Sequence, residues 1–191
     1  MTRDAGAPVP FVFVTVGTDH HPFDRLVRWV DGWLEANPGR VRCTVQAGTA
    51  ETPRAADHVG YVSVQRMEML MSEADAVICH GGPGAIAASR GSGIRPIVVP
   101  RSVKLGEHVD DHQRWFARRL ANEGQILLAE DEGAFRRLLT SALDDPEFVR
   151  RPAQADILDE TVRRFAAFVD PLLARRPQRL GDRLGWSRSL P

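Results

Sequence analysis

The sequence has few of the features that mark specialised classes of protein. It contains only two cysteines, Cys43 and Cys79, which cannot build a disulfide framework or a cysteine-rich zinc site. No apolar run reaches the roughly 18 residues that a membrane-spanning helix needs. The first residues, MTRDAGAPVP, also lack the apolar segment of a signal peptide. These absences lead us to expect a cytoplasmic protein.

The charges are balanced, which argues against a broad attraction to nucleic acid. The 191 residues include 25 Lys and Arg against 25 Asp and Glu, so the formal net charge is zero. Hydrophobic residues make up 43% of the chain and charged residues 26%, a composition typical of a folded domain. Because a domain commonly takes about 100–200 residues, we expect one domain with a tail.

Apolar runs alternate with amphipathic stretches along most of the chain. The runs expected to form buried strands are 11–16, 41–45, 59–62, 76–79, 96–100 and 125–129. Most are followed by helical periodicity, and one such stretch places Val109, Gln113 and Leu120 on one face. Strands without polar alternation, connected by helices, form parallel sheets that are covered on both faces. We therefore predict a Rossmann-like doubly wound α/β domain over residues 11–145, with its ligand at the carboxyl ends of the strands.

The two ends of the chain depart from this pattern. Residues 1–10 predict a flexible N-terminus, and residues 146–175 a long C-terminal helix. The helix is expected to carry an apolar stripe of Leu158, Val162, Phe165, Val169 and Leu172. We expect this stripe to pack either against the sheet or against a partner protein. Residues 176–191 are rich in arginine and predict a solvated tail, or one that contacts a membrane surface or an acidic partner.

A glycine-rich turn between a strand and a helix is the strongest candidate for a binding site. It reads His80-Gly81-Gly82-Pro83-Gly84, which is neither a dinucleotide fingerprint nor a P-loop. Glycines let backbone N–H groups approach a ligand, and a helix N-terminus favours phosphate. An imidazole at this position can donate to a sugar or phosphate oxygen. The alternative is a tight turn with a packed histidine.

A second candidate is the polar segment 106–113. Its carboxylates and amides, with Glu107, Asp111, His112 and Gln113 among them, can receive several sugar hydroxyls at once. Helix capping by Glu107 or Asp110 explains the same residues equally well. A metal site is the weaker alternative, since His108 and His112 are four residues apart on the expected helix but lack a distant third ligand.

A third cluster, Thr18-Asp19-His20-His21, follows the first strand. It can bind a ligand, supply a general base or form a polar turn. No Gly-x-Ser-x-Gly sequence accompanies it, so a hydrolase triad has no support.

Taken together, several motifs resemble the donor-binding, C-terminal half of GT-B glycosyltransferases of the family-28 type. They are FVTVGT at 13–18, PFD at 22–24, HGGPG at 80–84, PIVVPR at 96–101 and GEHVDDHQ at 106–113. More closely, the chain resembles the stand-alone small catalytic subunits of two-part UDP-sugar transferases. These act in dolichol-linked N-acetylglucosamine transfer and in bacterial exopolysaccharide synthesis.

The resemblance implies a set of donor-binding residues. The turn faces the diphosphate with backbone donors, His80 lies beside the phosphates or the sugar, and the 111–113 stretch holds the sugar. The set comprises Gly17, Thr18, His80, Gly81, Gly82, Gly84, Arg101, Glu107, Asp111, His112 and Gln113. Two positions depart from the family pattern, because Ala85 replaces a Thr or Ser and Ala88 replaces an acidic residue that holds the ribose. We expect Ser89 to compensate.

The resemblance also implies the reaction and its partner. A GT-B enzyme has two halves and this chain has room for one, so we expect a UDP-sugar transferase, in exopolysaccharide or glycolipid synthesis, completed by a membrane-anchored acceptor-binding subunit. The chain then works at the inner face of the membrane through that partner. The reaction inverts the anomeric carbon and requires no metal or cofactor. The catalytic base belongs to the partner, with His20 or His21 as candidates if this chain acts alone.

Other functions remain open at this point. One is a transferase of the same fold acting alone on a small natural-product acceptor, and another is a non-catalytic nucleotide-binding module. An NAD- or phosphate-dependent enzyme of another family is a further alternative.

Overall fold

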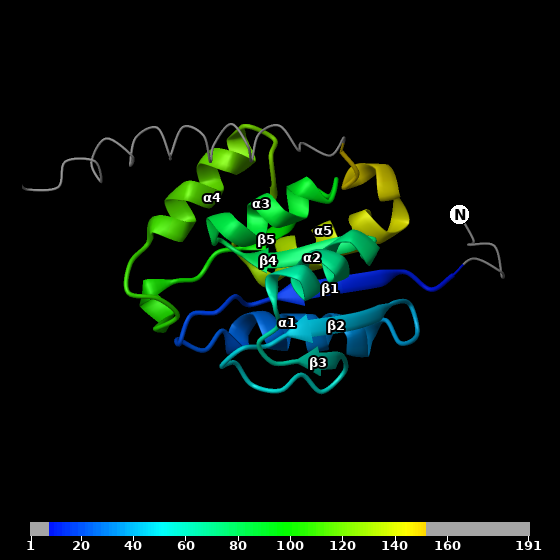
Figure 1. The fold of residues 1–191 in the computed structure, drawn as a ribbon, viewed down its shortest axis with the longest axis horizontal. Coiled ribbons are helices and arrows are strands. Elements are labelled where there is room, and N and C mark those ends of the chain that lie inside the picture. The colour runs from blue at the N-terminus through cyan, green and yellow to red at the C-terminus, as the bar shows by residue number, and fades with distance from the viewer. Residues whose placement is uncertain (1–7, 152–191) are drawn as a thin grey trace, which may run out of the picture. The chain divides into compact units, whose positions relative to one another are not determined.

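A computed structural model describes residues 8–151 and shows one six-stranded parallel sheet (Figure 1). The strand order is β3-β2-β1-β4-β5-β6, which is the doubly wound order of a Rossmann fold. The strands are β1 (Phe11–Thr15), β2 (Arg42–Gln46), β3 (Asp57–Val59), β4 (Ala76–His80), β5 (Ile97–Val99) and β6 (Leu127–Leu128). The predicted fold class is confirmed.

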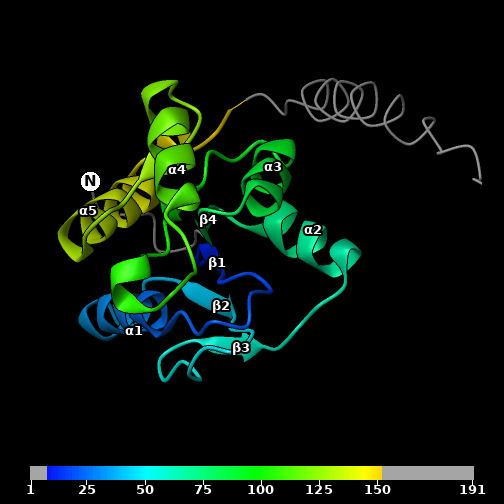
Figure 2. The ribbon, with the colours of Figure 1, turned by 90° about the vertical axis from the view of Figure 1, so that its left-hand side faces the viewer.

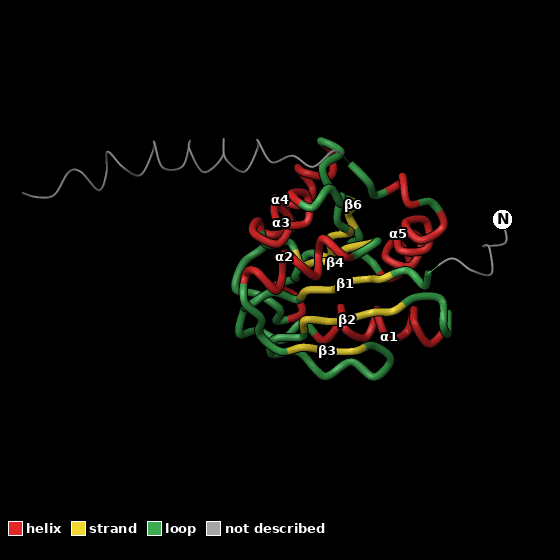
Figure 3. The backbone as a smooth tube through the Cα atoms, turned by 45° about the vertical axis from the view of Figure 1, so that its right-hand side comes forward, coloured by secondary structure: helices red, strands yellow, loops and turns green. Residues whose placement is uncertain are grey.

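The middle of the sheet is buried on both faces, as the apolar runs predict. Every residue of β1 is buried, and β1 pairs with β2 on one side and with β4 on the other. Figure 3 shows these strands side by side, and each neighbouring pair is parallel. Because they are parallel, their carboxyl ends lie together at one edge of the sheet, which we call the carboxyl edge.

Helices cover both faces of the sheet. They are α1 (Asp24–Ala36), α2 (Val64–Glu73), α3 (Pro83–Gly91), α4 (His112–Asn122) and α5 (Glu132–Asp144), with 3-10 turns η1 (Val103–Leu105) and η2 (Pro146–Phe148). Helices α1 and α5 lie on one side of the strands, and α2 and α3 on the other (Figure 2). Trp33 and Phe135 belong to the larger core cluster, while Cys79 and Val98 pack with Ile86 of α3 in a second one.

Side-chain caps fix the starts of two helices. Ser63 accepts a hydrogen bond from the backbone N–H of Arg66 at the start of α2, and Asp131 accepts one from Ala134 at the start of α5. Serine and aspartate are among the residues that are preferred at N-cap positions, because their side-chain oxygens accept from the free N–H groups of the first helical turn.

The structure corrects two expected boundaries. Strand β3 ends at Val59, where the sequence predicted it to begin. Helix α4 begins at His112, so Val109 precedes it and is 72% exposed rather than part of the buried face. For the same reason His108 and His112 do not lie four residues apart on one helix.

The predicted flanking segments fall largely outside the described residues. The chain divides into Met1–Gln154 and Ala155–Pro191, and the predicted helix over 146–175 is described only as far as 151, including η2. The predicted tail at 176–191 and residues 1–7 also lie outside. Within 8–151, no helix is long and apolar enough to span a membrane.

Candidate nucleotide-sugar site at the carboxyl edge

The carboxyl edge brings together three loops that are distant in the sequence. The loop after β1 begins at Val16, the glycine turn follows His80 at the end of β4, and the segment after β5 runs from Pro100 to α4. All three of the sequence-predicted clusters therefore lie at one edge of the sheet.

His80 is held between two of the predicted glycines. A Cβ atom on Gly17 would lie 2.4 Å from Cε1 of the ring, and one on Gly82 would lie 2.2 Å from Nε2. Gly17 also has a φ of +86°, in the left-handed region that favours glycine. These two glycines make room for the imidazole, so the packed-histidine alternative describes part of the turn correctly.

The other two glycines of the turn differ from each other. A Cβ on Gly81 would lie 2.9 Å from Cβ of Gln113, so this glycine lets the start of α4 approach β4. Gly84 is exposed and has no heavy atom within 4 Å of its Cβ position. Of the four predicted glycines, Gly84 is the one whose missing side chain leaves open space for a ligand.

The N-terminus of α3 offers backbone donors beside that space. Pro83 occupies its first turn and has no N–H, and the N–H of Ile86 bonds to the carbonyl of Gly82. Helix geometry leaves the N–H groups of Gly84 and Ala85 without intrahelical acceptors. With the positive end of the helix dipole, they form a site suited to phosphate.

Four predicted side chains carry buried polar atoms without a hydrogen-bond partner, and one of these atoms is Nε of Arg101, whose other two nitrogens are bonded. The other three are Nδ1 of His80, Oδ1 of Asp111 and Oε1 of Gln113. Asp111 stands at the N-cap position of α4, but its side chain accepts no capping hydrogen bond. A buried polar atom without a partner costs about 1–3 kcal/mol, so this concentration at one edge favours a polar ligand.

Burial also decides the charge of His80. Desolvation lowers the pKa of its imidazole to about 4, and the nearby Arg101 guanidinium acts in the same direction. The ring is therefore neutral at pH 7, and it can donate one hydrogen bond and accept another.

Arg101 and Glu107 lie beneath the carboxyl edge, which changes their expected role. Arg101 is fully buried and donates to the backbone carbonyls of Val16, His21 and Glu107 at 2.7–2.9 Å. Glu107 forms a bidentate pair with Arg25, with both N–O distances 2.8 Å, and accepts from the N–H of Ser102. Both side chains hold the loops together, which favours a positioning role, and their direct contact with the donor stays a prediction.

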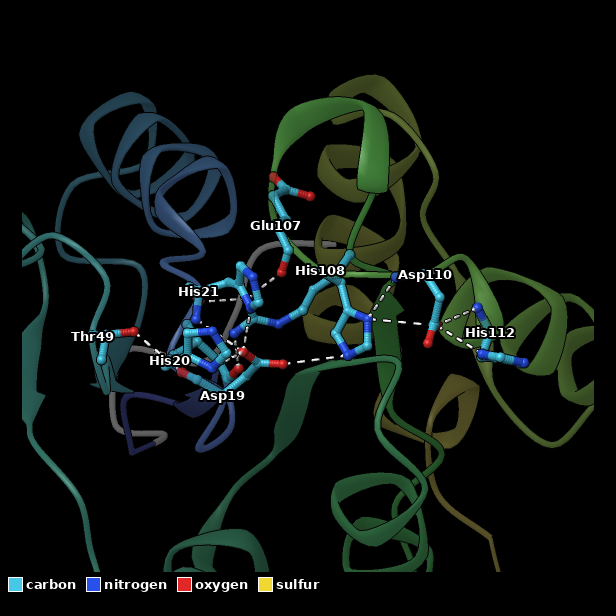
Figure 4. Close-up of polar contacts among 10 residues, drawn as sticks. Asp19, His20, His21, Thr49, Glu107, His108, Asp110 and His112 are labelled. Carbon is cyan, nitrogen blue, oxygen red and sulfur yellow. Dashed lines mark hydrogen bonds and ion pairs between the residues drawn. The ribbon is translucent and has the colours of Figure 1, made fainter.

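Asp19 is the centre of a histidine cluster that joins two of the loops (Figure 4). Its Oδ1 lies 2.7 Å from Nδ1 of His21 and 3.4 Å from Nδ1 of His20, and its Oδ2 lies 3.3 Å from Nε2 of His108. Burial alone would raise the pKa of Asp19, but the hydrogen bonds from the N–H and ring of His21, with Arg101, hold it at about 2. The carboxylate is therefore ionised at neutral pH.

The remaining predicted residues lie at the margin. The side chain of His112 is 89% exposed and pairs with Asp110 at 2.9 Å, on the far side of Asp110 from the cluster (Figure 4). Asp110 also accepts from the N–H of His112, but the N-cap position of α4 belongs to Asp111, so the capping alternative for Asp110 is wrong. Thr18 is exposed beside the cluster. The expectation for Ser89 is wrong, because its hydroxyl is fully buried and donates to the carbonyl of Ile94.

Sequence reasoning missed three residues that shape the site. Buried Thr15 and Gln46 share a hydrogen bond of 2.6 Å, and each also bonds to the backbone of Gly17, which fixes that loop. His108 contacts Asp19 from a segment 89 positions away in the numbering. A polar pair inside two otherwise apolar strands was the available signal for Thr15 and Gln46, whereas no local pattern pairs His108 with Asp19.

The fold and this edge define the chain as the donor-binding half of a GT-B glycosyltransferase fold. Residues 11–145 match the family described as the glycosyltransferase family 28 C-terminal domain. The match covers most of the chain, so the chain belongs to that family. No curated protein matches the chain.

Solved structures share the fold at low sequence identity. The calicheamicin glycosyltransferase CalG4 is 17% identical with a TM-score of 0.58, and 92% of this chain covers 45% of it. MurG of Acinetobacter baumannii is 19% identical with a TM-score of 0.53, and 76% of this chain covers 44% of it. A putative UDP-N-acetylglucosamine 2-epimerase from Listeria monocytogenes is 10% identical with a TM-score of 0.55, and 92% covers 50% of it. The chain thus spans half or less of the length of each of these proteins.

Proposed function

We propose that the carboxyl edge binds a UDP-sugar donor and that the chain transfers the sugar, with inversion, to an acceptor held by a second half of the enzyme. The observation that carries this proposal is the group of buried, unpartnered polar atoms on His80, Asp111 and Gln113. They lie at the same edge as the free N–H groups of α3, which suit a diphosphate. The Listeria neighbour is named for a UDP-sugar, which supports uridine as the nucleotide.

In this scheme the chain stabilises the charge that develops on the leaving diphosphate. The N–H groups of Gly84 and Ala85 and the dipole of α3 act on the phosphate oxygens, and neutral His80 adds a hydrogen bond. Asp111 and Gln113 accept hydroxyl protons of the sugar and fix its orientation for in-line displacement. The scheme uses no metal ion or cofactor.

A binding assay tests the donor assignment. We expect UDP and UDP-sugars, at about ten times their Kd, to stabilise the protein by about 1.4 kcal/mol, or about 3–6 °C. TDP, GDP and NAD should give smaller shifts at the same concentration. A rise in Tm with NAD alone would overturn the assignment of a uridine nucleotide and would favour an NAD-dependent enzyme.

A substitution that keeps shape but removes polarity tests the sugar contact. Gln113→Met should weaken UDP-sugar binding about tenfold, since one hydrogen bond is worth about 1–1.5 kcal/mol. It should leave UDP binding and the stability of the unliganded protein unchanged or improved. Gln125→Met is the matched control, because Gln125 bonds to Arg90 and Glu123 near the start of β6, away from the carboxyl edge. Unchanged UDP-sugar affinity in Gln113→Met would contradict the role of Gln113.

We propose further that the acceptor-binding half is a separate, membrane-anchored subunit, that the pair acts at the inner face of the membrane, and that its product is an exopolysaccharide or glycolipid. The motif resemblance supports this arrangement. Transfer from radiolabelled UDP-sugar should require co-expression with such a subunit. Transfer by the chain alone would favour an enzyme acting on a small acceptor, with the Asp19–His21 pair as its candidate base.

A non-catalytic module is the second candidate, and one observation favours it. Ala85 and Ala88 have no hydroxyl or carboxylate to offer a ligand, and both are half-buried against the core. Ser89 does not replace them, because its hydroxyl donates to the carbonyl of Ile94. This candidate predicts nucleotide binding without transfer in any combination of subunits.

A further inference from the structure

The turn that follows β1 directs three potential metal ligands toward one point. Asp19, His20 and His21 each offer one ligand atom, and these atoms lie within 4.8 Å of one another. Both imidazoles point Nδ1 at the same carboxylate oxygen of Asp19, at 2.7 and 3.4 Å (Figure 4). Atoms bound to a common tetrahedral Zn²⁺ at about 2.0–2.1 Å lie about 3.3 Å apart, so the 3.4 Å separation fits such a site and the 2.7 Å one has to lengthen by about 0.6 Å.

The backbone of this turn is fixed from several sides. The N–H of His21 donates to Oδ1 of Asp19 at 2.9 Å, and the Thr49 hydroxyl donates to the carbonyl of Asp19 at 3.2 Å. Arg101 donates to the carbonyl of His21 at 2.7 Å from its buried position. A bound ion would leave the contacts of Thr49 and Arg101 with this turn intact. It would replace the hydrogen bonds that His21 makes to Oδ1 of Asp19.

His108 provides the outer contact that orients a ligating carboxylate. Its Nδ1 accepts a hydrogen bond from the N–H of Asp110 at 3.2 Å, so the ring proton is on Nε2. That Nε2 faces Oδ2 of Asp19 at 3.3 Å. The carboxylate is thus anchored through Oδ2 and leaves Oδ1 toward the two imidazoles, as outer-shell donors do in metal sites.

We propose that Asp19, His20 and His21 bind one divalent transition-metal ion, with Zn²⁺ or Co²⁺ as the fitting class. Two imidazole nitrogens and one carboxylate oxygen suit these ions better than Mg²⁺ or Ca²⁺, which prefer oxygen ligands alone. Three protein ligands leave at least one coordination position open. The exposed ring of His20 lies on the solvent side of the site, with 84% of its side chain accessible.

The site goes beyond the proposed sugar transfer and does not depend on it. The transfer scheme uses no metal, and the metal ligands are not among the atoms assigned to the donor. The two sites are neighbours, because Gly17, two residues before Asp19, packs against His80.

Cobalt titration of the full chain, prepared without a histidine tag and stripped with EDTA, tests the proposal. We expect visible d–d absorption that saturates at one Co²⁺ per chain and that Zn²⁺ displaces. His20→Ala should weaken Co²⁺ binding at least tenfold, since even outer-shell losses cost about 10–100-fold. Because the His20 side chain is exposed, its removal should leave the thermal unfolding of the metal-free protein unchanged.

His112→Ala is the matched control, since His112 is also an exposed histidine beside an aspartate but lies outside the cluster. It should change the Co²⁺ affinity less than twofold. Absence of saturable Co²⁺ absorption, or equal losses in both variants, would overturn the site and leave Asp19 and His21 as a hydrogen-bonded pair. UDP binding by the metal-free chain is measured alongside, so failure of the metal site is distinguishable from failure of the donor site.

Discussion

Replacement of Gly82 by alanine should destabilise the protein through one neighbour, His80. The added Cβ would lie 2.2 Å from Nε2, 2.9 Å from Cδ2 and 3.1 Å from Cε1 of the imidazole. The ring is rigid and is bounded on its other side by Gly17, so it cannot shift within its slot. The backbone of Gly82 has φ −73° and ψ 131°, which alanine adopts without strain. The steric overlap therefore accounts for most of the effect.

The magnitude follows from the cost of overpacking. An inserted methyl group in a packed region costs about 1–3 kcal/mol. A change of 1 kcal/mol moves the Tm of a protein of this size by about 2–4 °C, so we expect a loss of about 2–12 °C for Gly82→Ala. Gly84→Ala is the matched control in the same turn, since nothing lies within 4 Å of its Cβ position. It should leave the Tm unchanged or raise it, because alanine is favoured over glycine in a helix.

A double-mutant cycle with His80→Ala isolates the contact. In the absence of the ring, Gly82→Ala should cost close to nothing, which gives an interaction free energy of about 1–3 kcal/mol. The four proteins are compared by urea unfolding at pH 7. If Gly82→Ala costs the same with and without the imidazole, the ring is not what requires glycine at this position, and the steric reasoning is refuted.

Two further predictions concern buried charge. Burial lowers the pKa of His80 from 6.5 in the unfolded chain to about 4 in the folded protein. Between pH 6.5 and 4 the unfolded chain therefore binds a proton on His80 that the folded protein does not. The free energy of unfolding falls as the pH falls, by about 2 kcal/mol at pH 5. Urea unfolding of His80→Gln should show a shallower loss over this window, and an unchanged slope would mean that His80 titrates normally. Arg25→Met leaves the buried carboxylate of Glu107 without its ion-pair partner and should lower the free energy of unfolding by about 3–5 kcal/mol. Arg119→Met removes an exposed ion pair with Glu123 and should lower it by under about 1 kcal/mol. Equal losses in the two variants would show that burial does not strengthen the Arg25–Glu107 pair.

The fold could be predicted because its signals are local. The runs around β1, β4 and β5 are apolar on both faces, and only a covered parallel sheet buries such strands. The start of α4 was misplaced for a local reason too, since Val109 continues the apolar spacing of the helix but lies in the loop before it. Periodicity does not show where the backbone stops being helical.

The roles of the site residues were harder to predict because they depend on contacts across the sheet. The glycines of the turn were expected to make room for a ligand, yet Gly82 makes room for His80 and Gly81 for Gln113. Both explanations require glycine at the same positions, so the sequence alone does not separate them. Glu107 likewise looks like a free carboxylate until Arg25, 82 positions earlier, is found beside it.

The state of each polar atom separates the residues that build the edge from those that remain free for a ligand. Two guanidinium nitrogens of Arg101 and the carboxylates of Glu107 and Asp19 contact other loops, so these groups are already engaged in the unliganded protein. Nδ1 of His80 and Oε1 of Gln113 are equally buried but have no partner. A donor that satisfies them recovers a cost already present in the unliganded protein, so binding there needs no rearrangement of the loops. Arg25, Glu107 and Asp19 therefore fix the geometry of the edge, while the unpaired atoms of His80, Asp111 and Gln113 are the ones available to recognise the sugar nucleotide.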